Sequence, residues 1–247
     1  MTTIDHFFVF GIAIVFPIAS FISFRRLLAR IAKGEKFKRS EIYTSTALSL
    51  WGIFAATIAL WMFSDRSWAD LGLNLQLDGA FFFAALLTVA GVVALYFQRR
   101  HVMSADRETQ KGYLDQLGTM DVFLPRTGNE LGRFYGVSLS AGIVEEVVWR
   151  GFLIWYLSFY MPVWAAAIVS SIGFGLAHAY QGFRNVPQVT LVGGVFALLF
   201  VISGSVWLPM ILHAAVDMFQ GRLAYDVVNL TNGDQAPPND APAAASA

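Results

Sequence analysis

Seven long apolar segments follow one another along the chain. The core of a bilayer is about 30 Å thick, and a helix needs roughly 20 apolar residues to cross it. Segments of about that length lie near 5–24, 43–63, 79–98, 132–158, 162–186, 187–204 and 206–227. Pro187 marks the boundary between the fifth and sixth segments, because proline disfavours helix in the residue before it. The pattern predicts an all-α, polytopic transmembrane bundle of about seven spans, with six to eight as the range.

The composition agrees with a membrane protein and excludes several kinds of chemistry. Hydrophobic residues make up 56% of the 247 residues and charged residues only 14%, whereas a soluble domain carries about 25% charged residues. The formal net charge is zero, which argues against a nucleic-acid partner, since such domains carry a basic patch. The chain has no cysteine, so disulfides and thiolate catalysis are excluded.

The distribution of Lys and Arg predicts how the chain is oriented in the membrane. Seven of them lie in the stretch 25–41 and six in 99–133, whereas the connection 64–78 holds Arg66 alone. Loops rich in Lys and Arg stay in the cytoplasm. We therefore expect both basic stretches to be cytoplasmic, the N-terminus outside and the C-terminus inside, with the bacterial inner membrane as the expected location.

Ionisable residues inside membrane spans are rare, costly and usually functional. Six lie at membrane depth, all in the second half of the chain: Glu145, Glu146, Arg150, His178, His213 and Asp217. The first three spans carry essentially none. This asymmetry predicts a lipid-facing scaffold followed by a polar core.

Two adjacent glutamates precede an arginine in the fourth segment. Glu146 and Arg150 are spaced i and i+4 with the acid first, which is the favoured order for a helical ion pair. Glu145 lies about 100° away around the helix, so it is free to face a cavity and to act as a general base. The alternative is structural, with both glutamates bridging helices around Arg150.

Two histidines lie in later segments. His213 and Asp217 share one helix face at i and i+4, where an imidazole beside a carboxylate can bind a metal or donate to an oxyanion. His178 follows Phe174 by one turn. The alternative for each histidine is a structural hydrogen bond between or within helices.

Helical rise predicts that these groups meet. At about 1.5 Å per residue, Glu145 lies ~19 Å and His213 ~20 Å from the cytoplasmic face. His178 lies ~12 Å from it if the fifth span continues to Val186, and too close to that face if the span ends near Tyr180. The depths predict one site near the midplane that opens inward.

Three motifs in this order resemble the signature of the CAAX protease and bacteriocin-processing (CPBP) family, which includes type II CaaX prenyl endopeptidases. They are Glu145-Glu146-x-x-x-Arg150, Phe174-x-x-x-His178 and His213-x-x-x-Asp217. The resemblance covers about 105 residues, from Leu124 to Leu230. It implies that Glu145 and His178 activate a water molecule, and that Glu146 and Arg150 organise the motif. We divide the chain into a scaffold with basic loops (1–130), a catalytic helical core (131–230) and a tail (231–247) that is rich in Ala, Pro and Asn and expected to be disordered.

The resemblance further implies that His213 and Asp217 line the oxyanion side of the site. The family often has Asn where this chain has Asp217, and an ionised Asp cannot donate a hydrogen bond. That departure leaves open a metal-dependent version in which Glu145, His178 and His213 bind zinc or another divalent ion. We favour a site without a cofactor.

The function expected from the residues and the resemblance is that of an intramembrane endopeptidase. Its partners would be the lipid bilayer and a peptide or membrane-protein substrate, cleaved near the inner leaflet by water that glutamate and histidine activate. Ser170 and Ser171 lie about two turns from His178, a poor arrangement for a serine nucleophile. Two alternatives use the same residues: a proton-coupled transporter, and a non-catalytic immunity or scaffold protein.

Overall fold

The computed structural model describes residues 1–233 of the chain, and within that range every regular element is a helix. Two stretches of π-helix interrupt the α-helices, and short 3-10 turns join some of them. The elements are α1 (Thr3–Phe10), η1 (Gly11–Val15), α2 (Phe16–Ala32), α3 (Arg39–Phe63), α4 (Gly79–Ser104), α5 (Arg107–Leu117), η2 (Gly118–Phe123), α6 (Gly128–Glu145), η3 (Glu146–Leu153), α7 (Ile154–Leu157), α8 (Val163–Ala177), η4 (Ala179–Gln181), η5 (Phe183–Asn185), α9 (Val186–Ser203) and α10 (Trp207–Gly233).

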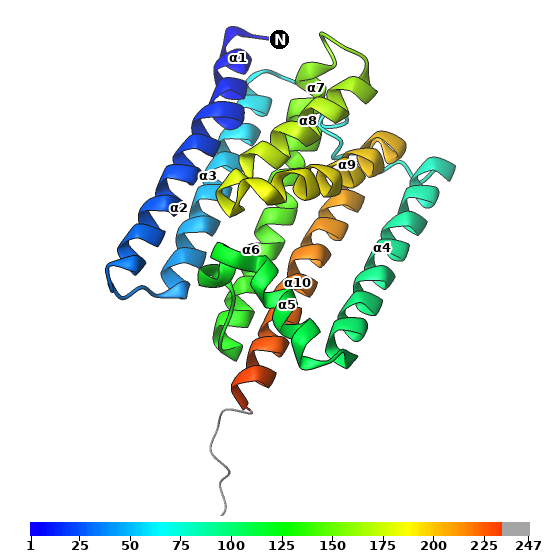
Figure 1. Cartoon of the computed structure of the whole chain (residues 1–247). Helices are drawn as coiled ribbons and strands as arrows, with labels where there is room; N and C mark the ends of the chain where they lie inside the picture. Colours follow the sequence, from blue (N-terminus) through cyan, green and yellow to red (C-terminus); the bar gives the residue numbers. More distant parts are fainter. Residues whose placement is uncertain (234–247) are drawn as a thin grey trace, which may run out of the picture.

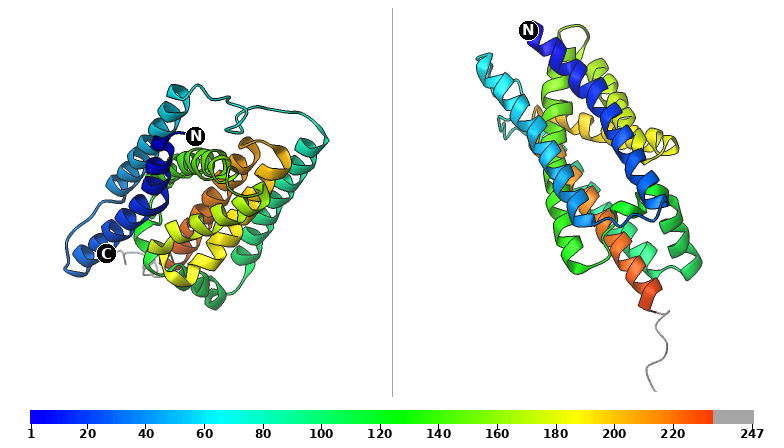
Figure 2. Two further views of the ribbon diagram at one scale, coloured as in Figure 1. Left: turned by 90° about the horizontal axis from the view of Figure 1, so that it is seen from above. Right: turned by 90° about the vertical axis from the view of Figure 1, so that its left-hand side faces the viewer.

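The long helices form a bundle with one helix across it. In Figure 1, α2, α3, α4, α6 and α10 run roughly along one direction, and α9 runs across them. The second view in Figure 2 shows the same crossing. Helix α6 packs against both α3 and α10, while α9 packs mainly against α8 and α4. The α6 helix therefore lies between α3 and α10, and η3, which continues it, contacts α9.

Within residues 1–233, four stretches are long and apolar enough to cross a membrane: Thr3–Ala32, Arg39–Phe63, Gly79–Ser104 and Phe183–Ser203. They correspond to the first, second, third and sixth predicted spans. The other three predicted spans are also helical, as α6 to α7, α8 and α10. The protein is a multi-pass, all-α membrane protein, as predicted, and the number seven stays a prediction.

The fifth predicted span is shorter than expected. We predicted a helix over 162–186, but α8 ends at Ala177, and His178 caps it with non-helical backbone angles. Two 3-10 turns follow, separated by Gly182 at φ 115°, a backbone conformation that glycine adopts readily. Apolar composition continues through this region, so hydropathy alone did not show the break. The boundary predicted at Pro187 is displaced: α9 begins at Val186, so the residue before the proline is helical, and the break between the two helices lies at residues 178–185.

A buried ion pair attaches the N-terminal helix to the bundle. Arg66, in the connection after α3, donates hydrogen bonds to both carboxylate oxygens of Asp5 at 2.8 and 2.7 Å. The Arg66 guanidinium also lies over the rings of Trp61 and Trp155. Only 6% of the most apolar window in the Thr3–Ala32 stretch is buried, so this pair holds a helix that otherwise contacts the bundle sparsely.

The two basic segments lie at the same end of the bundle. The α2–α3 connection and the region around α5 are both at the lower end in Figure 1, opposite the N-terminus. Helix α10 continues to Gly233 at that end. The rest of the tail predicted to be disordered, 234–247, lies outside the described residues.

Small residues on α6 allow close approach of α10. A Cβ atom added at Gly142 would lie 2.9 Å from the backbone oxygen of Met210 and 2.9 Å from the backbone nitrogen of Ala214. Small residues on one face of a helix let membrane helices pack closely.

Gly142→Val is expected to destabilise the protein by about 1–3 kcal/mol, because the backbone of α10 would have to move. Thermal melts in detergent measure this loss. Gly136→Val is the matched control on the same helix, since a Cβ atom at Gly136 meets nothing within 4 Å. Equal melting of both variants would contradict the close packing of α6 on α10.

Candidate active site

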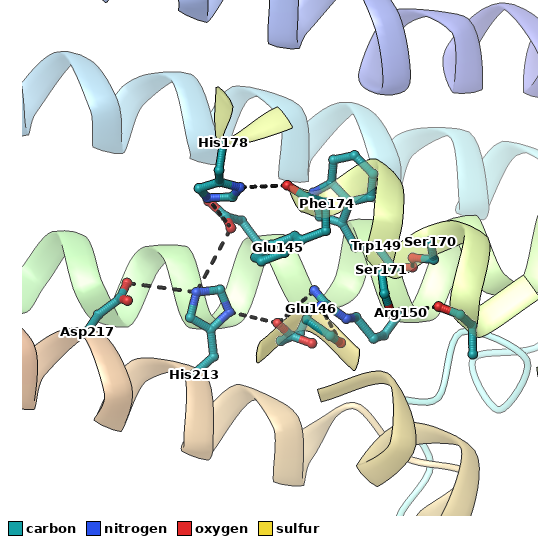
Figure 3. A network of polar contacts seen from close by, with 12 residues as sticks. Glu145, Glu146, Trp149, Arg150, Ser170, Ser171, Phe174, His178, His213 and Asp217 are labelled. Atoms are coloured by element: carbon teal, nitrogen blue, oxygen red, sulfur yellow. Dashed lines mark hydrogen bonds and ion pairs between the residues drawn. The ribbon is translucent and has the colours of Figure 1, made fainter. Parts of the chain in front are cut away.

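The six ionisable residues predicted for the site come together from three helical regions. Figure 3 shows them around the junction of α6 and η3, with α8 on one side and α10 on the other. Glu145 ends α6 and Glu146 begins η3. The side chain of Asp217 is 37% exposed and stands at the edge of the group.

Glu146 accepts two hydrogen bonds on one oxygen. Arg150 Nη1 donates to Glu146 Oε1 at 3.0 Å, which confirms the predicted ion pair. His213 Nδ1 donates to the same oxygen at 2.7 Å, a contact that the sequence did not predict. Glu146 and Arg150 are fully buried, so the carboxylate links the arginine to the histidine in the interior of the bundle.

Each histidine is held by its Nδ1 atom. His178 Nδ1 lies 2.8 Å from the carbonyl oxygen of Phe174. A carbonyl only accepts, so Nδ1 carries the proton, and the Nε2 atom of a neutral His178 is an acceptor. The bond from His213 Nδ1 to Glu146 likewise turns His213 Nε2 toward the centre of the site. Figure 3 shows both rings directed at Glu145.

Glu145 lies between the two imidazoles. Its Oε2 atom is 3.7 Å from His178 Nε2 and 3.9 Å from His213 Nε2. Oε2 is buried and has no hydrogen-bond partner among the described residues. The separations are too long for direct hydrogen bonds and suit bridging by one water molecule. Asp217 Oδ2 lies 3.8 Å from His213 Nε2, so Asp217 is near this centre without a hydrogen bond to the histidine.

Aromatic rings fix the orientation of the polar groups. The Phe196 ring stacks on His213 with 4.8 Å between ring centroids and an interplanar angle of 16°. The Arg150 guanidinium lies over the rings of Phe174 and Phe196, at 4.3 and 5.4 Å from their centroids. We did not single out Phe196 from the sequence, because an aromatic residue in an apolar segment carries no distinguishing signal.

A glycine on α9 accepts a hydrogen bond from Arg150 through its backbone carbonyl. Arg150 Nη2 donates to the carbonyl oxygen of Gly193 at 2.9 Å. A Cβ atom at Gly193 would lie only 3.0 Å from that same nitrogen and 2.9 Å from the ring of Phe174. A side chain at this position would therefore push α9 away from the arginine.

The hydroxyls of Ser170 and Ser171 donate hydrogen bonds to backbone carbonyls. Ser170 donates to the carbonyl oxygen of Trp149 at 2.7 Å, and Ser171 donates to that of Ala167 at 2.7 Å. Both are buried. Neither hydroxyl forms a hydrogen bond with a histidine, which agrees with the poor spacing predicted for a serine–histidine pair.

A cleft of about 650 Å³ leads to Glu145 and His178. Its walls come from α2 and α3, and its other end lies at the connection between them, near Lys36 and Lys38. Apolar side chains line it together with a row of hydroxyls: Ser20, Ser23, Ser45, Thr46 and Ser49. The expectation that the first spans form only a lipid-facing scaffold is thus incomplete, because α2 and α3 also enclose the approach to the site.

The break after α8 does not remove His178 from the site. From helical rise, a span that ends near Tyr180 is expected to leave this histidine too close to the inner face. The helix does end early, yet His178 lies beside Glu145. Helical rise gives comparable depths only for helices of similar direction, whereas α9, which follows α8, runs across the bundle (Figure 1).

Glu145, His178 and His213 were also considered as metal ligands. Among residues 1–233, no group of three or more His, Asp or Glu side chains is arranged to hold a metal ion. A site without a metal therefore stays a prediction, which metal analysis of the purified protein tests.

The fold and the site together define a multi-pass helical membrane protein with a buried glutamate–histidine centre. Residues 127–219 match the family model described as Type II CAAX prenyl endopeptidase Rce1-like. The match confirms the family resemblance over this stretch and contains all six ionisable residues of the site. No curated protein and no solved structure matches the chain.

Proposed function

We propose that the protein is an intramembrane endopeptidase in which Glu145 activates a water molecule for attack on a peptide bond. The observation that carries the proposal is the Glu145 Oε2 atom, which is buried, has no partner among the described residues and faces two imidazole nitrogens at the end of a cleft. The match of residues 127–219 to a prenyl endopeptidase family supports the reaction class.

Glu145 and His178 both accept hydrogen bonds from the attacking water in this mechanism. The water donates one hydrogen bond to Glu145 and the other to His178 Nε2, which is an acceptor because Nδ1 carries the proton. Its lone pair then attacks the scissile carbonyl carbon while Glu145 takes the proton. When the tetrahedral intermediate collapses, the C–N bond breaks and protonated Glu145 returns its proton to the leaving amine.

His213 stabilises the oxyanion in this scheme. A carboxylate hydrogen-bonded to Nδ1 stabilises an imidazolium, and Glu146 holds that position at 2.7 Å from His213 Nδ1. In the imidazolium form, Nε2 donates a hydrogen bond to the developing negative charge. An ionised Asp217 cannot donate; it adds negative charge near His213 and supports the same protonated state.

The cleft gives the substrate an approach from the end that carries the basic segments. From Lys38 to Leu50 on α3, twelve residues of helix span about 18 Å, which an extended peptide of about five or six residues would cover. Ser45 and Ser49 already donate to backbone carbonyls of α3, and their oxygens can still accept hydrogen bonds from the backbone N–H groups of a peptide.

The proposal is tested by comparing peptides released from membranes that contain the protein with those from membranes that lack it. New fragment ends that arise only with the intact protein support a peptidase. The purified protein is then assayed on the peptides so identified, with and without a chelator and after metal analysis. Bound metal in stoichiometric amount, together with loss of activity on chelation, would replace the metal-free mechanism. Absence of any cleaved peptide, with proton-coupled transport instead, would contradict the proposed function.

We also propose that the basic end of the bundle faces the cytoplasm, in a bacterial inner membrane. Thirteen Lys and Arg residues lie in 25–41 and 99–133 against one in 64–78, and both basic stretches lie at one end of the structure. Reporter fusions at Lys36 and Asp70 are expected to report opposite sides, with Lys36 inside. The same side for both fusions, or Lys36 outside, would contradict this orientation.

A further inference from the structure

A second cavity, of about 340 Å³, lies where α3 and α6 begin. Three cationic side chains line it, Lys38, Arg39 and Arg133, with Glu130 as the one carboxylate; the other lining residues are Phe37, Ser40, Thr127 and Asn129. It shares Phe37 and Lys38 with the mouth of the cleft. The cavity lies far from the candidate active site, since the sixteen residues from Asn129 to Glu145 span about 24 Å of helix.

The two arginines of this cavity are unpaired. Neither Arg39 nor Arg133 forms an ion pair within the described part of the chain, and the Nε atom of Arg39 is buried without a hydrogen-bond acceptor. Phe37 holds the Arg39 guanidinium, which lies 5.3 Å from the ring centroid. Buried N–H groups in folded proteins nearly always find an acceptor, so an external acceptor is expected here.

The single carboxylate in the cavity is already occupied. Glu130 Oε2 accepts hydrogen bonds from the backbone nitrogens of Arg126 at 2.7 Å and Thr127 at 3.3 Å, as part of the capping box that starts α6. Lys38 has a neighbour in Glu41 at 3.7 Å, but both side chains are more than two-thirds exposed, where an ion pair contributes little. The two arginines therefore remain available to an anion.

The backbone adds to the positive field. Lys38 precedes α3 without a side-chain cap, and Thr127 precedes α6. The first N–H groups of a helix carry partial positive charge and favour anions. Both helix starts border the same cavity, at the end of the bundle where the positive charge of the chain gathers.

We propose that this cavity binds a phosphate group, in the first place that of an anionic phospholipid headgroup. A guanidinium presents a planar fork that matches phosphate oxygens, and basic pockets between membrane helices on the cytoplasmic side bind such headgroups. The site holds the starts of α3 and α6 together at the mouth of the cleft. It does not depend on the proposed peptidase activity.

The test uses the full chain, purified in an uncharged detergent. Short-chain phosphatidylglycerol is titrated and the melting temperature is followed, with short-chain phosphatidylcholine and inorganic phosphate as separate arms. We expect a saturable rise in melting temperature with phosphatidylglycerol and a much weaker one with phosphatidylcholine. If inorganic phosphate alone raises the melting temperature as much as phosphatidylglycerol does, the ligand is soluble phosphate rather than a lipid headgroup.

The matched variants decide whether the cavity is responsible. R39Q/R133Q is expected to bind phosphatidylglycerol about 30-fold more weakly, since each basic residue near an anionic headgroup contributes a factor of about five. R26Q/R100Q removes two arginines that do not line the cavity and is expected to bind like the parent. If R39Q/R133Q fails to fold, R133Q alone is expected to bind about fivefold more weakly. The proposal would be overturned if the parent showed no saturable rise in melting temperature with phosphatidylglycerol. It would also be overturned if R26Q/R100Q bound phosphatidylglycerol as weakly as R39Q/R133Q.

Discussion

Glu145→Gln is expected to lower turnover by about 10²–10⁴-fold, the usual contribution of a positioned general base, while the melting temperature stays at that of the parent. Glutamine keeps the shape of the side chain and loses only the basic carboxylate. Because Glu145 Oε2 has no hydrogen-bond partner among the described residues, its replacement breaks no hydrogen bond at that atom. A peptide cleavage assay and a thermal melt on the same preparation measure the two quantities.

Glu146→Gln is the matched comparison for that prediction. Glu146 accepts from Arg150 and His213, so this variant is expected to lose stability as well as activity. Replacing Glu145 should therefore lower activity alone, whereas replacing Glu146 should lower both activity and stability. Normal cleavage by Glu145→Gln would remove the proposed mechanism, and loss of cleavage only together with unfolding would make Glu145 a structural residue.

Arg150→Ala is expected to destabilise the protein by about 3–5 kcal/mol, the cost of breaking a buried ion pair by removing one partner. The substitution leaves the Glu146 carboxylate without its cation and the Gly193 carbonyl without its donor. It also empties the space between the rings of Phe174 and Phe196. Thermal or denaturant unfolding in detergent and the amount of protein in the membrane both report the loss.

Two comparisons separate this effect from a general sensitivity to lost arginines. Arg222→Ala removes another i, i+4 partner, on α10, where the arginine side chain is 46% exposed, and it should cost at most about 1 kcal/mol. The double variant Glu146→Gln with Arg150→Met removes both charges and is expected to be more stable than Arg150→Ala. If Arg150→Ala melts like the parent, the buried pair does not stabilise the fold.

Much of the site could be predicted because ionisable residues in apolar segments are conspicuous. The i, i+4 spacing of Glu146 and Arg150 predicted their ion pair, and the offset of Glu145 predicted a carboxylate free of it. The bond between Glu146 and His213 could not be predicted in the same way. It joins residues 67 positions apart, and helical periodicity carries no information about which helices pack together.

The sequence predicted where the helices lie along the chain, but it predicted less of how they pack against one another. The apolar segments are helices, and a capping box of Thr127 and Glu130 starts α6. The end of α8 at Ala177 and the crossing direction of α9 were not predictable. Both depend on tertiary packing, such as the contact of Gly175 with Thr190 and Val186, rather than on hydropathy.

The stretch of π-helix from Glu146 to Leu153 has a consequence for insertions and deletions. A π-helical turn holds one residue more than an α-helical turn. Deleting a single residue from this stretch would return it to ordinary helix, and because the wider turn absorbs the extra residue, the segments before and after it would keep their rotation relative to each other. The same deletion in the α-helical part of α6 would instead rotate the earlier part of α6 by about 100° relative to Glu145. When this chain is aligned with relatives, a one-residue gap within 146–153 therefore indicates an ordinary helical turn in place of the π-helical one, rather than a rotated site.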